Sequence, residues 1–324
     1  ALSALGLAAL SARHGPLLLI YGCLMMIGSA QAFNGPASSA LVAQIIPMEA
    51  YESAITWRSS MQQVSAVLGP AAGGFLIGLF HGGTWVFALY AVAALSYALL
   101  LASLRVRPAA ARVIRGRTLR SITEGVRFLG QTRVLLAAIT LDLFAVLLGG
   151  ATTLLPIFAK DILHVGPIGL GWLQAAASAG AVCMALTLAH RPAFTHAGRT
   201  LLLAVAGFGL ATIVFGLSRS FALSFVMLFL LGVMDNISVV IRSTLLLVRT
   251  PDEMRGRVGA VNSLFIGTSN QLGGFESGLA AQLFGPVIAV VAGGVGTLLV
   301  VLLVARFWPE MRRLRTLSEP APRH

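Results

Sequence analysis

The sequence predicts an all-α polytopic membrane protein, and three observations support this fold class. Of the 324 residues, 57% are hydrophobic and only 10% are charged, whereas a soluble domain carries about 25% charged residues. Apolar stretches long enough to cross a bilayer recur along the chain. Positive charge gathers between these stretches, as in cytoplasmic membrane loops. Because lipid cannot satisfy backbone polar groups, each stretch is expected to be a helix.

The apolar segments can be placed in order along the chain. The opening segment, 1–11, has about half the length that a span requires, so we expect a helix that begins upstream of Ala1. Nine full spans follow, each bounded by polar or charged residues. We place them near 16–46, 54–80, 84–104, 134–158, 168–189, 200–218, 221–248, 257–284 and 286–305.

The basic residues predict the orientation of these spans. With the C-terminus in the cytoplasm, 18 of the 23 basic residues lie inside, in 105–133, 191–199, 249–257 and the tail from 306. This asymmetry orients membrane proteins and accounts for the formal net charge of +12 without a nucleic-acid partner. We expect anionic lipid to contact the basic inner loops.

A weak repeat at an offset of 204 residues predicts two related halves. The repeated pairs that include proline or glycine are Pro47 and Pro251, Gly28 and Gly232, Gly69 and Gly273, and Gly74 and Gly278. Six spans separate the copies, which therefore share one orientation, as in parallel repeats. By the same offset, two helices and part of a third are expected to be missing before Ala1.

This repeat divides the chain into four expected regions. The remainder of an N-terminal helix bundle covers 1–104, and a basic cytoplasmic linker covers 105–133. Apolar residues at helical spacing within 118–129 predict an amphipathic helix in the linker. A C-terminal bundle covers 134–305, and a cytoplasmic tail covers 306–324.

A glycine-proline cluster lies in the middle of the span at 54–80. Small side chains allow helices to approach closely, and a proline removes a backbone hydrogen bond and permits a kink. These residues are candidates for a hinge or seal between the halves, with simple tight packing as the alternative. They are Gly69, Pro70, Gly73 and Gly74.

The start of the span at 257–284 carries charged residues on its inner edge. Thr250, Pro251 and Glu253 have the spacing of a capping box, with Thr250 as the cap. Asp252, Arg255 and Arg257 are candidates for an inner gate loop.

Four charged residues lie deep within apolar spans, and a fifth, Arg58, lies closer to the inner end of its span. The four are Asp142, Asp235, Arg242 and Glu276. A charge at membrane depth costs a few kcal/mol, so it usually faces a partner or a water-filled path. Asp235 and Arg242 lie about 10 Å apart along one helix, too far for a direct salt bridge. With Asn236, these residues are candidates for proton coupling or substrate contact. Fixed ion pairs and neutral buried acids are the alternatives.

No cofactor or metal site is expected. The only lysine, Lys160, lies between Ala159 and Asp161, so the sequence lacks the Gly-Lys-Ser/Thr core of a phosphate-binding loop. Cys23 and Cys183 lie far apart, without metal-ligand spacing. Transport would therefore depend on an ion gradient or on a separate ATPase subunit.

Several motifs resemble the enterobactin-exporter branch of the major facilitator superfamily. They are Gly232-Val-Met-Asp-Asn-Ile-Ser, Thr250-Pro-Asp-Glu-Met-Arg-Gly-Arg257, Ser269-Asn-Gln-Leu-Gly-Gly-Phe-Glu276, Leu155-Pro-Ile-Phe-Ala159 and Gly69-Pro-Ala-Ala-Gly-Gly74. The resemblance implies two six-helix bundles around a central cavity, with the spans here being the end of helix three and helices four to twelve. Ser65 and Thr56 stand where the longer antiporter pattern has glycines.

The same resemblance implies a non-enzymatic, monomeric transporter in the bacterial cytoplasmic membrane. Its expected activity is proton-driven export of siderophores, drugs or other small amphipathic molecules by alternating access. Uptake of a nutrient by symport and the membrane subunit of an ATP-driven exporter are the alternatives.

Overall fold

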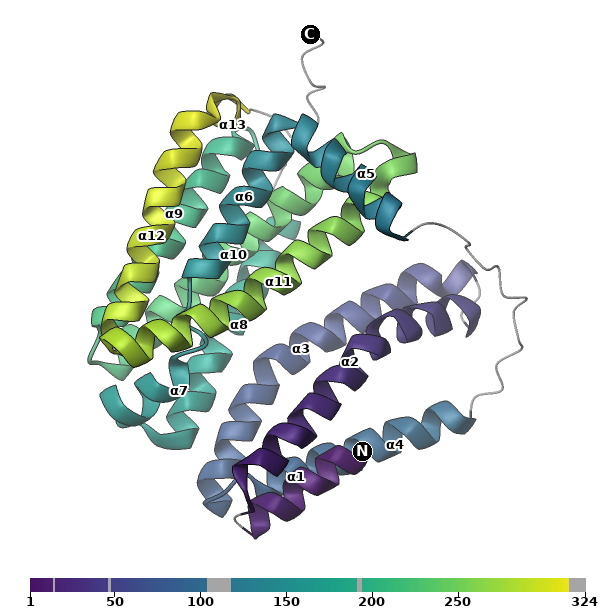
Figure 1. Ribbon diagram of the computed structural model, residues 1–324, viewed down its shortest axis with the longest axis vertical. Coiled ribbons are helices and arrows are strands. Elements are labelled where there is room, and N and C mark those ends of the chain that lie inside the picture. Colours follow the sequence, from purple (N-terminus) through teal and green to yellow (C-terminus); the bar gives the residue numbers. More distant parts are fainter. Residues whose placement is uncertain (14, 46–47, 104–117, 191–193, 315–324) are drawn as a thin grey trace. The chain divides into compact units, whose positions relative to one another are not determined.

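All regular secondary structure in the computed structural model is helical over the residues that it describes (Figure 1). These are all residues except 14, 46–47, 104–117, 191–193 and 315–324. The predicted all-α class is thereby confirmed. Residue contacts divide the chain into two units, described separately below. The first comprises 1–114 and 166–171, and the second comprises 115–165 and 172–324.

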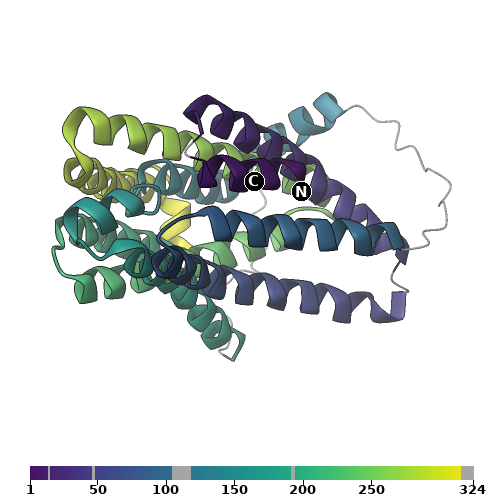
Figure 2. The same ribbon diagram turned by 90° about the horizontal axis from the view of Figure 1, so that it is seen from below.

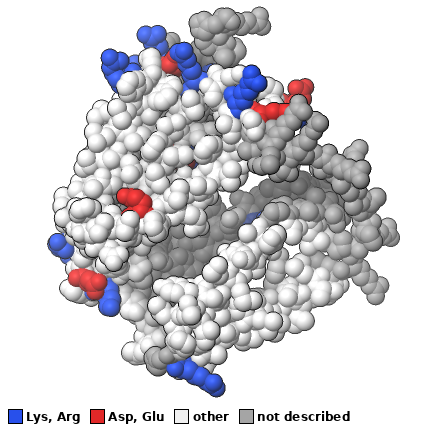
Figure 3. Space-filling model, viewed as in Figure 1, with Lys and Arg blue, Asp and Glu red and all other residues white. Residues whose placement is uncertain are grey.

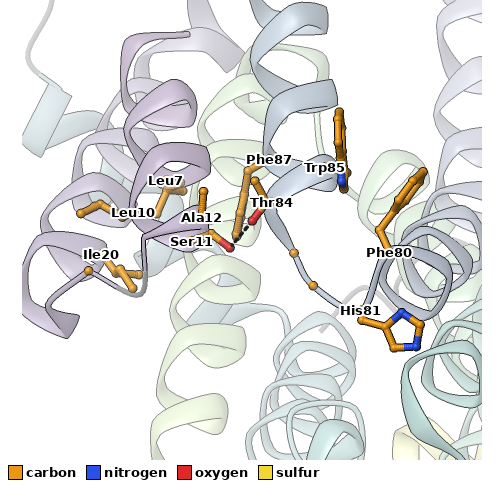
Figure 4. Close-up of a pocket in the computed structure, with 13 residues that line it drawn as sticks. Leu7, Leu10, Ser11, Ala12, Ile20, Phe80, His81, Thr84, Trp85 and Phe87 are labelled. Atoms are coloured by element: carbon orange, nitrogen blue, oxygen red, sulfur yellow. Dashed lines mark hydrogen bonds between the residues drawn. The ribbon is translucent and has the colours of Figure 1, made fainter.

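The first unit contains mainly long apolar helices. α1 packs against α2 and α4, and α3 also packs against α4 (Figures 1 and 2). The Thr84 hydroxyl donates a 3.0 Å hydrogen bond to the Ser11 hydroxyl and ties the start of α4 to the end of α1 (Figure 4). The helices are α1 (Leu2–Ala12), α2 (Leu17–Ile45), α3 (Met48–Phe80) and α4 (Thr84–Ser103).

The second unit is a bundle with a buried apolar core. α9 packs against α10 and α12, and α6 packs against α11 and α12. Phe158 and Phe215 stack with ring centroids 4.8 Å apart. The helices are α5 (Thr118–Gln131), α6 (Arg133–Leu148), α7 (Leu155–Ile157), η1 (Phe158–Ile162), α8 (Gly166–Ala189, whose first six residues belong to the first unit), α9 (Ala197–Leu217), α10 (Phe221–Arg249), α11 (Asp252–Phe284), α12 (Pro286–Phe307) and α13 (Pro309–Arg313).

Small residues allow two helices of this bundle to touch backbone to backbone. Gly180 of α8 faces the carbonyl of Phe229, and Gly232 of α10 faces the carbonyl of Ala177. A β-carbon at either glycine would overlap its neighbour. Such close crossings are how helices pack when lipid removes the hydrophobic drive to associate.

Seven helices of the described chain are long and apolar enough to cross a membrane. An eighth span results if α5 and α6, which meet at a bend of 107°, are counted together. The nine expected spans are all represented by helices, but α6 has only 16 residues. α11 is long enough, at 33 residues, but is the most polar of the long helices.

The surface agrees with a membrane environment. Large apolar side chains such as Leu18, Phe33 and Leu203 are more than 70% exposed, which a protein in water avoids and a protein in lipid does not. Figure 3 shows Lys and Arg near the ends of the second unit and a wide belt nearly free of them.

Candidate functional site

The helix that begins at Arg133 is interrupted inside the expected span 134–158. α6 ends at Leu148, the chain continues without regular structure through Gly149 and Gly150, and α7 starts at Leu155. The prediction of one continuous span was therefore wrong at this point. Two consecutive glycines weaken a helix, and irregular backbone at membrane depth is tolerated where it is buried in protein or lines a cavity.

The end of α6 is held by close contact with α11. A β-carbon at Gly273 would lie 2.9 Å from the carbonyl oxygen of Leu147 and 3.0 Å from that of Val146. Any larger side chain would push the two helices apart. Gly273 therefore lets the last turn of α6 rest directly on α11.

A cavity of about 310 Å³ lies beside this interruption. This volume is at the lower end of the range for small-molecule pockets, about 300 to 1,000 Å³. Its walls come from α6, the irregular segment, α8, α9, α10 and α11. The lining residues are Val146, Gly149, Gly150, Ala151, Thr152, Thr153, Ala177, Ser178, Ala181, Phe208, Leu231, Gly232, Asp235, Asn270, Gly273 and Gly274.

The structure brings Asp142 of α6 and Arg242 of α10 together as an ion pair between Oδ1 and Nη1. Both side chains are almost completely buried, with exposed fractions of 10% and 5%. The pair joins residues 100 positions apart in the sequence, so inspection of each span alone could not reveal it. The two opposite charges cancel within the bundle.

Asp235 lies between this ion pair and the larger cavity. It lines the cavity of about 310 Å³ and also a void of about 20 Å³ whose other wall includes Asp142. Ser238 and Phe208 line the void as well. Among the described residues that line this mostly apolar void, the polar ones are Asp142, Asp235 and Ser238.

Glu276 and Asn236, the other polar candidates within the spans, line neither cavity. Glu276 is exposed and accepts a 3.4 Å hydrogen bond from the Ser277 hydroxyl. Asn236 is half-buried, and its Oδ1 has no hydrogen-bond partner in the described chain. Among the predicted site residues, the structure thus groups Asp142, Arg242 and Asp235.

Sequence reasoning did not single out the hydroxyl groups of this cavity. Thr152, Thr153 and Ser178 line it, although none lies in a charged or glycine-proline motif. A usable signal was present, because Gly149-Gly150 followed by Thr152-Thr153 interrupts an otherwise apolar segment. Interrupted spans of this kind point to binding sites in transporters.

The glycine-proline cluster lies within a continuous α3, with Pro70 inside the helix. A β-carbon at Gly74 would lie 2.8 Å from the Cα of Gly171, a residue that belongs to the same unit. Gly69 and Gly73 face open space. Close approach is therefore a property of Gly74, and the hinge role of the cluster stays a prediction.

The predicted inner edge is tied to the linker helix. Arg257 Nη1 donates a 2.6 Å hydrogen bond to Glu124 Oε2 of α5, and Arg255 forms a 2.7 Å ion pair with Asp252. The capping-box prediction was wrong. α11 starts at Asp252 with Pro251 at the cap position, and the buried Thr250 hydroxyl makes no hydrogen bond in the described chain.

At the short helix α13, Glu310 accepts a 3.2 Å hydrogen bond from Arg133 Nη1. A backbone hydrogen bond at Glu310, aided by Arg133, lowers the pKa of this exposed carboxyl.

Comparison with known proteins identifies similar sequences along nearly the whole chain. The profile of the family described as transmembrane secretion effector, within the major facilitator superfamily, matches residues 2–320. The enterobactin exporter EntS of Escherichia coli O1:K1 is 29% identical over 253 residues, which cover 78% of this chain and 60% of the relative. The enterobactin exporter EntS of Shigella flexneri is 29% identical over 279 residues, or 86% of this chain and 65% of the relative. The chain thus matches between 60% and 65% of the length of these relatives.

Proposed function

We propose that this chain, which belongs to the transmembrane secretion effector family of the major facilitator superfamily, acts in a secondary transporter. The transporter exports a small amphipathic molecule across the bacterial cytoplasmic membrane in exchange for protons, by alternating access. Support comes from the family match and from relatives named as exporters. The cytoplasmic position of the C-terminus belongs to the same proposal and follows from the distribution of arginines.

The single observation that carries the proposal is the contrast between two acids in the bundle. Arg242 already neutralises Asp142 through a buried ion pair, so Asp142 gains little from a proton. Asp235 faces a cavity large enough for a small molecule. Because a lone carboxylate is costly at membrane depth, Asp235 is the group most readily neutralised by a ligand. In this proposal the ligand is a proton for part of the transport cycle.

The other predicted residues support the cycle in less direct ways. Gly69, Pro70, Gly73 and Gly74 are proposed to supply mobility in α3, where Gly74 forms a close backbone contact. Asp252, Arg255 and Arg257 are proposed to hold the start of α11 through the two exposed ion pairs described above. Glu276 is retained as a second candidate for proton binding. Anionic lipid is proposed to neutralise the basic loops.

Transport in proteoliposomes with an imposed pH gradient tests this function. Amphipathic fluorescent dyes of positive, neutral and negative charge serve as probes. The expected result is movement of at least one dye against the proton gradient, abolished by a protonophore and by Asp235→Asn. Asp161→Asn, which removes an acid outside the cavity, serves as the matched control and should transport normally.

Three outcomes would contradict the proposal. Equal gradient-driven transport by the Asp235→Asn variant would exclude that acid from coupling. Dye movement down the proton gradient would favour uptake by symport. Transport that depends on ATP and ignores the protonophore would favour the membrane subunit of an ATP-driven exporter.

A further inference from the structure

The cavity of about 310 Å³ has a negative character. Among the described residues that line it, Asp235 is the only one with a charged side chain. The nearest arginine along α10, Arg242, is already paired with Asp142. No basic side chain is therefore found among the described residues of the cavity wall to compensate the carboxylate of Asp235.

The end of α6 adds to this negative character. The C-terminus of a helix carries about half a negative charge, because the last carbonyl groups lack partners within the helix. Val146 in the last turn of α6 and Gly149 directly after it line the cavity. The last turn of α6 has no basic residue. Asp235 and the C-terminus of α6 thus both contribute negative electrostatic potential to the cavity.

The remaining lining residues suit the uncharged part of a ligand. Phe208, Leu231 and Val146 offer apolar surface, while Thr152, Thr153 and Ser178 offer hydroxyl groups. The Asn270 amide nitrogen donates to the carbonyl of Ile266 at 3.0 Å, which leaves its oxygen as the acceptor. An aromatic face such as that of Phe208 also attracts cations.

We infer that this cavity binds an organic cation, a protonated amine or quaternary ammonium whose positive group lies at Asp235 and whose apolar body lies against Phe208 and Leu231. An anion of the same size would meet a carboxylate and a helix C-terminus, both of which repel it. The inference rests on the proposed function and names the substrate class for that site. A proton and the cationic group of the ligand cannot neutralise the Asp235 carboxylate at the same time, so binding of one excludes the other.

Protection of a cysteine in the cavity wall tests the inference without requiring transport. The two free cysteines, Cys23 and Cys183, are first replaced by alanine. Thr153, an exposed residue that lines the cavity, is then changed to cysteine. The purified protein in detergent is labelled with N-ethylmaleimide in increasing concentrations of phenyltrimethylammonium. Benzenesulfonate, an anion of similar size, is the matched probe.

The expected result is that phenyltrimethylammonium slows labelling and benzenesulfonate does not. Asp235→Asn should raise the half-protective concentration of phenyltrimethylammonium by about tenfold or more, whereas Asp161→Asn should leave protection intact. Equal protection by benzenesulfonate, or unchanged protection in Asp235→Asn, would overturn the inference. Ser178→Cys is the second reporter, and failure of both cysteines to react would also overturn it.

Binding and transport can fail separately in these experiments. Cation-specific protection without gradient-driven transport would preserve the binding site and contradict the proposed function. Gradient-driven transport of an anionic or neutral dye, without cation-specific protection, would preserve the function and contradict the substrate class.

Discussion

Asp142 and Asp235 are residues of the same type that line one small void, yet their surroundings differ. Asp142 is buried against an arginine, with which it forms an ion pair. Asp235 has no such partner in the described part of the chain and lines a cavity of about 310 Å³. Charge within an apolar span therefore does not by itself identify a transport residue. What distinguishes the two acids is whether a protein cation or a cavity lies next to them.

The largest expected effect on stability comes from breaking the buried ion pair. Arg242→Met leaves Asp142 buried without its partner, which costs about 3 to 5 kcal/mol in other proteins. We expect a large fall in the temperature at which the purified protein loses its monodisperse state in detergent. Asp142→Asn combined with Arg242→Met should recover most of this loss, because it removes both charges. No recovery in the double variant would show that Arg242 stabilises the bundle by other contacts.

The next largest effect concerns the crossing that positions α10. Gly232 lies one helical turn before Asp235, and a β-carbon there would lie 2.8 Å from the carbonyl carbon of Ala177. Gly232→Val should destabilise the protein by about 1 to 3 kcal/mol through overpacking and also shift Asp235. Thermal denaturation and the cysteine-protection assay measure the two consequences. Gly278→Ala is the control, because a β-carbon at Gly278 would meet no other described part of the chain within 4 Å, its own helix backbone and sequence neighbours aside.

A destabilised Gly232→Val variant with unchanged cation protection would separate the two consequences. The crossing would then support the bundle without setting the position of Asp235. A Gly278→Ala variant as unstable as Gly232→Val would instead indicate that any added methyl group disturbs these helices.

How much the sequence could reveal follows from the range over which each signal acts. Helices were predictable because runs of apolar residues are local, and Asp142, Asp235 and Arg242 were noticeable because charge is rare within such runs. The pairing of Asp142 with Arg242 depends on how α6 meets α10, which no single segment specifies. The hydropathy of the sequence likewise predicted one span over 134–158. Gly149 and Gly150 lower the mean hydropathy of this segment too little to mark the interruption.

A smaller effect on stability is expected from the unpaired acid. Asp235→Asn keeps the shape of the side chain and removes a carboxylate that no basic side chain accompanies among the described residues of the cavity wall, so stability should change by less than about 1 kcal/mol. Asp142→Asn should cost more, because it leaves Arg242 buried without its counter-ion. Thermal denaturation of the two variants side by side measures the contrast. Equal destabilisation would mean that Asp235 also has a fixed structural partner.

The smallest effect is expected where α5 meets α11. The ion pair between Glu124 and Arg257 is 2.6 Å long, but its side chains are 36% and 43% exposed, and exposed pairs contribute about 0 to 1 kcal/mol. Gly125 is the firmer contact, because a β-carbon there would lie 3.0 Å from the carbonyl oxygen of Arg257 and 2.9 Å from a methyl group of Val261. We therefore expect Arg257→Gln to change thermal stability only slightly, and less at high salt, whereas Gly125→Val destabilises the protein clearly. If Arg257→Gln were the more damaging change, charge rather than close packing would hold the linker helix on α11.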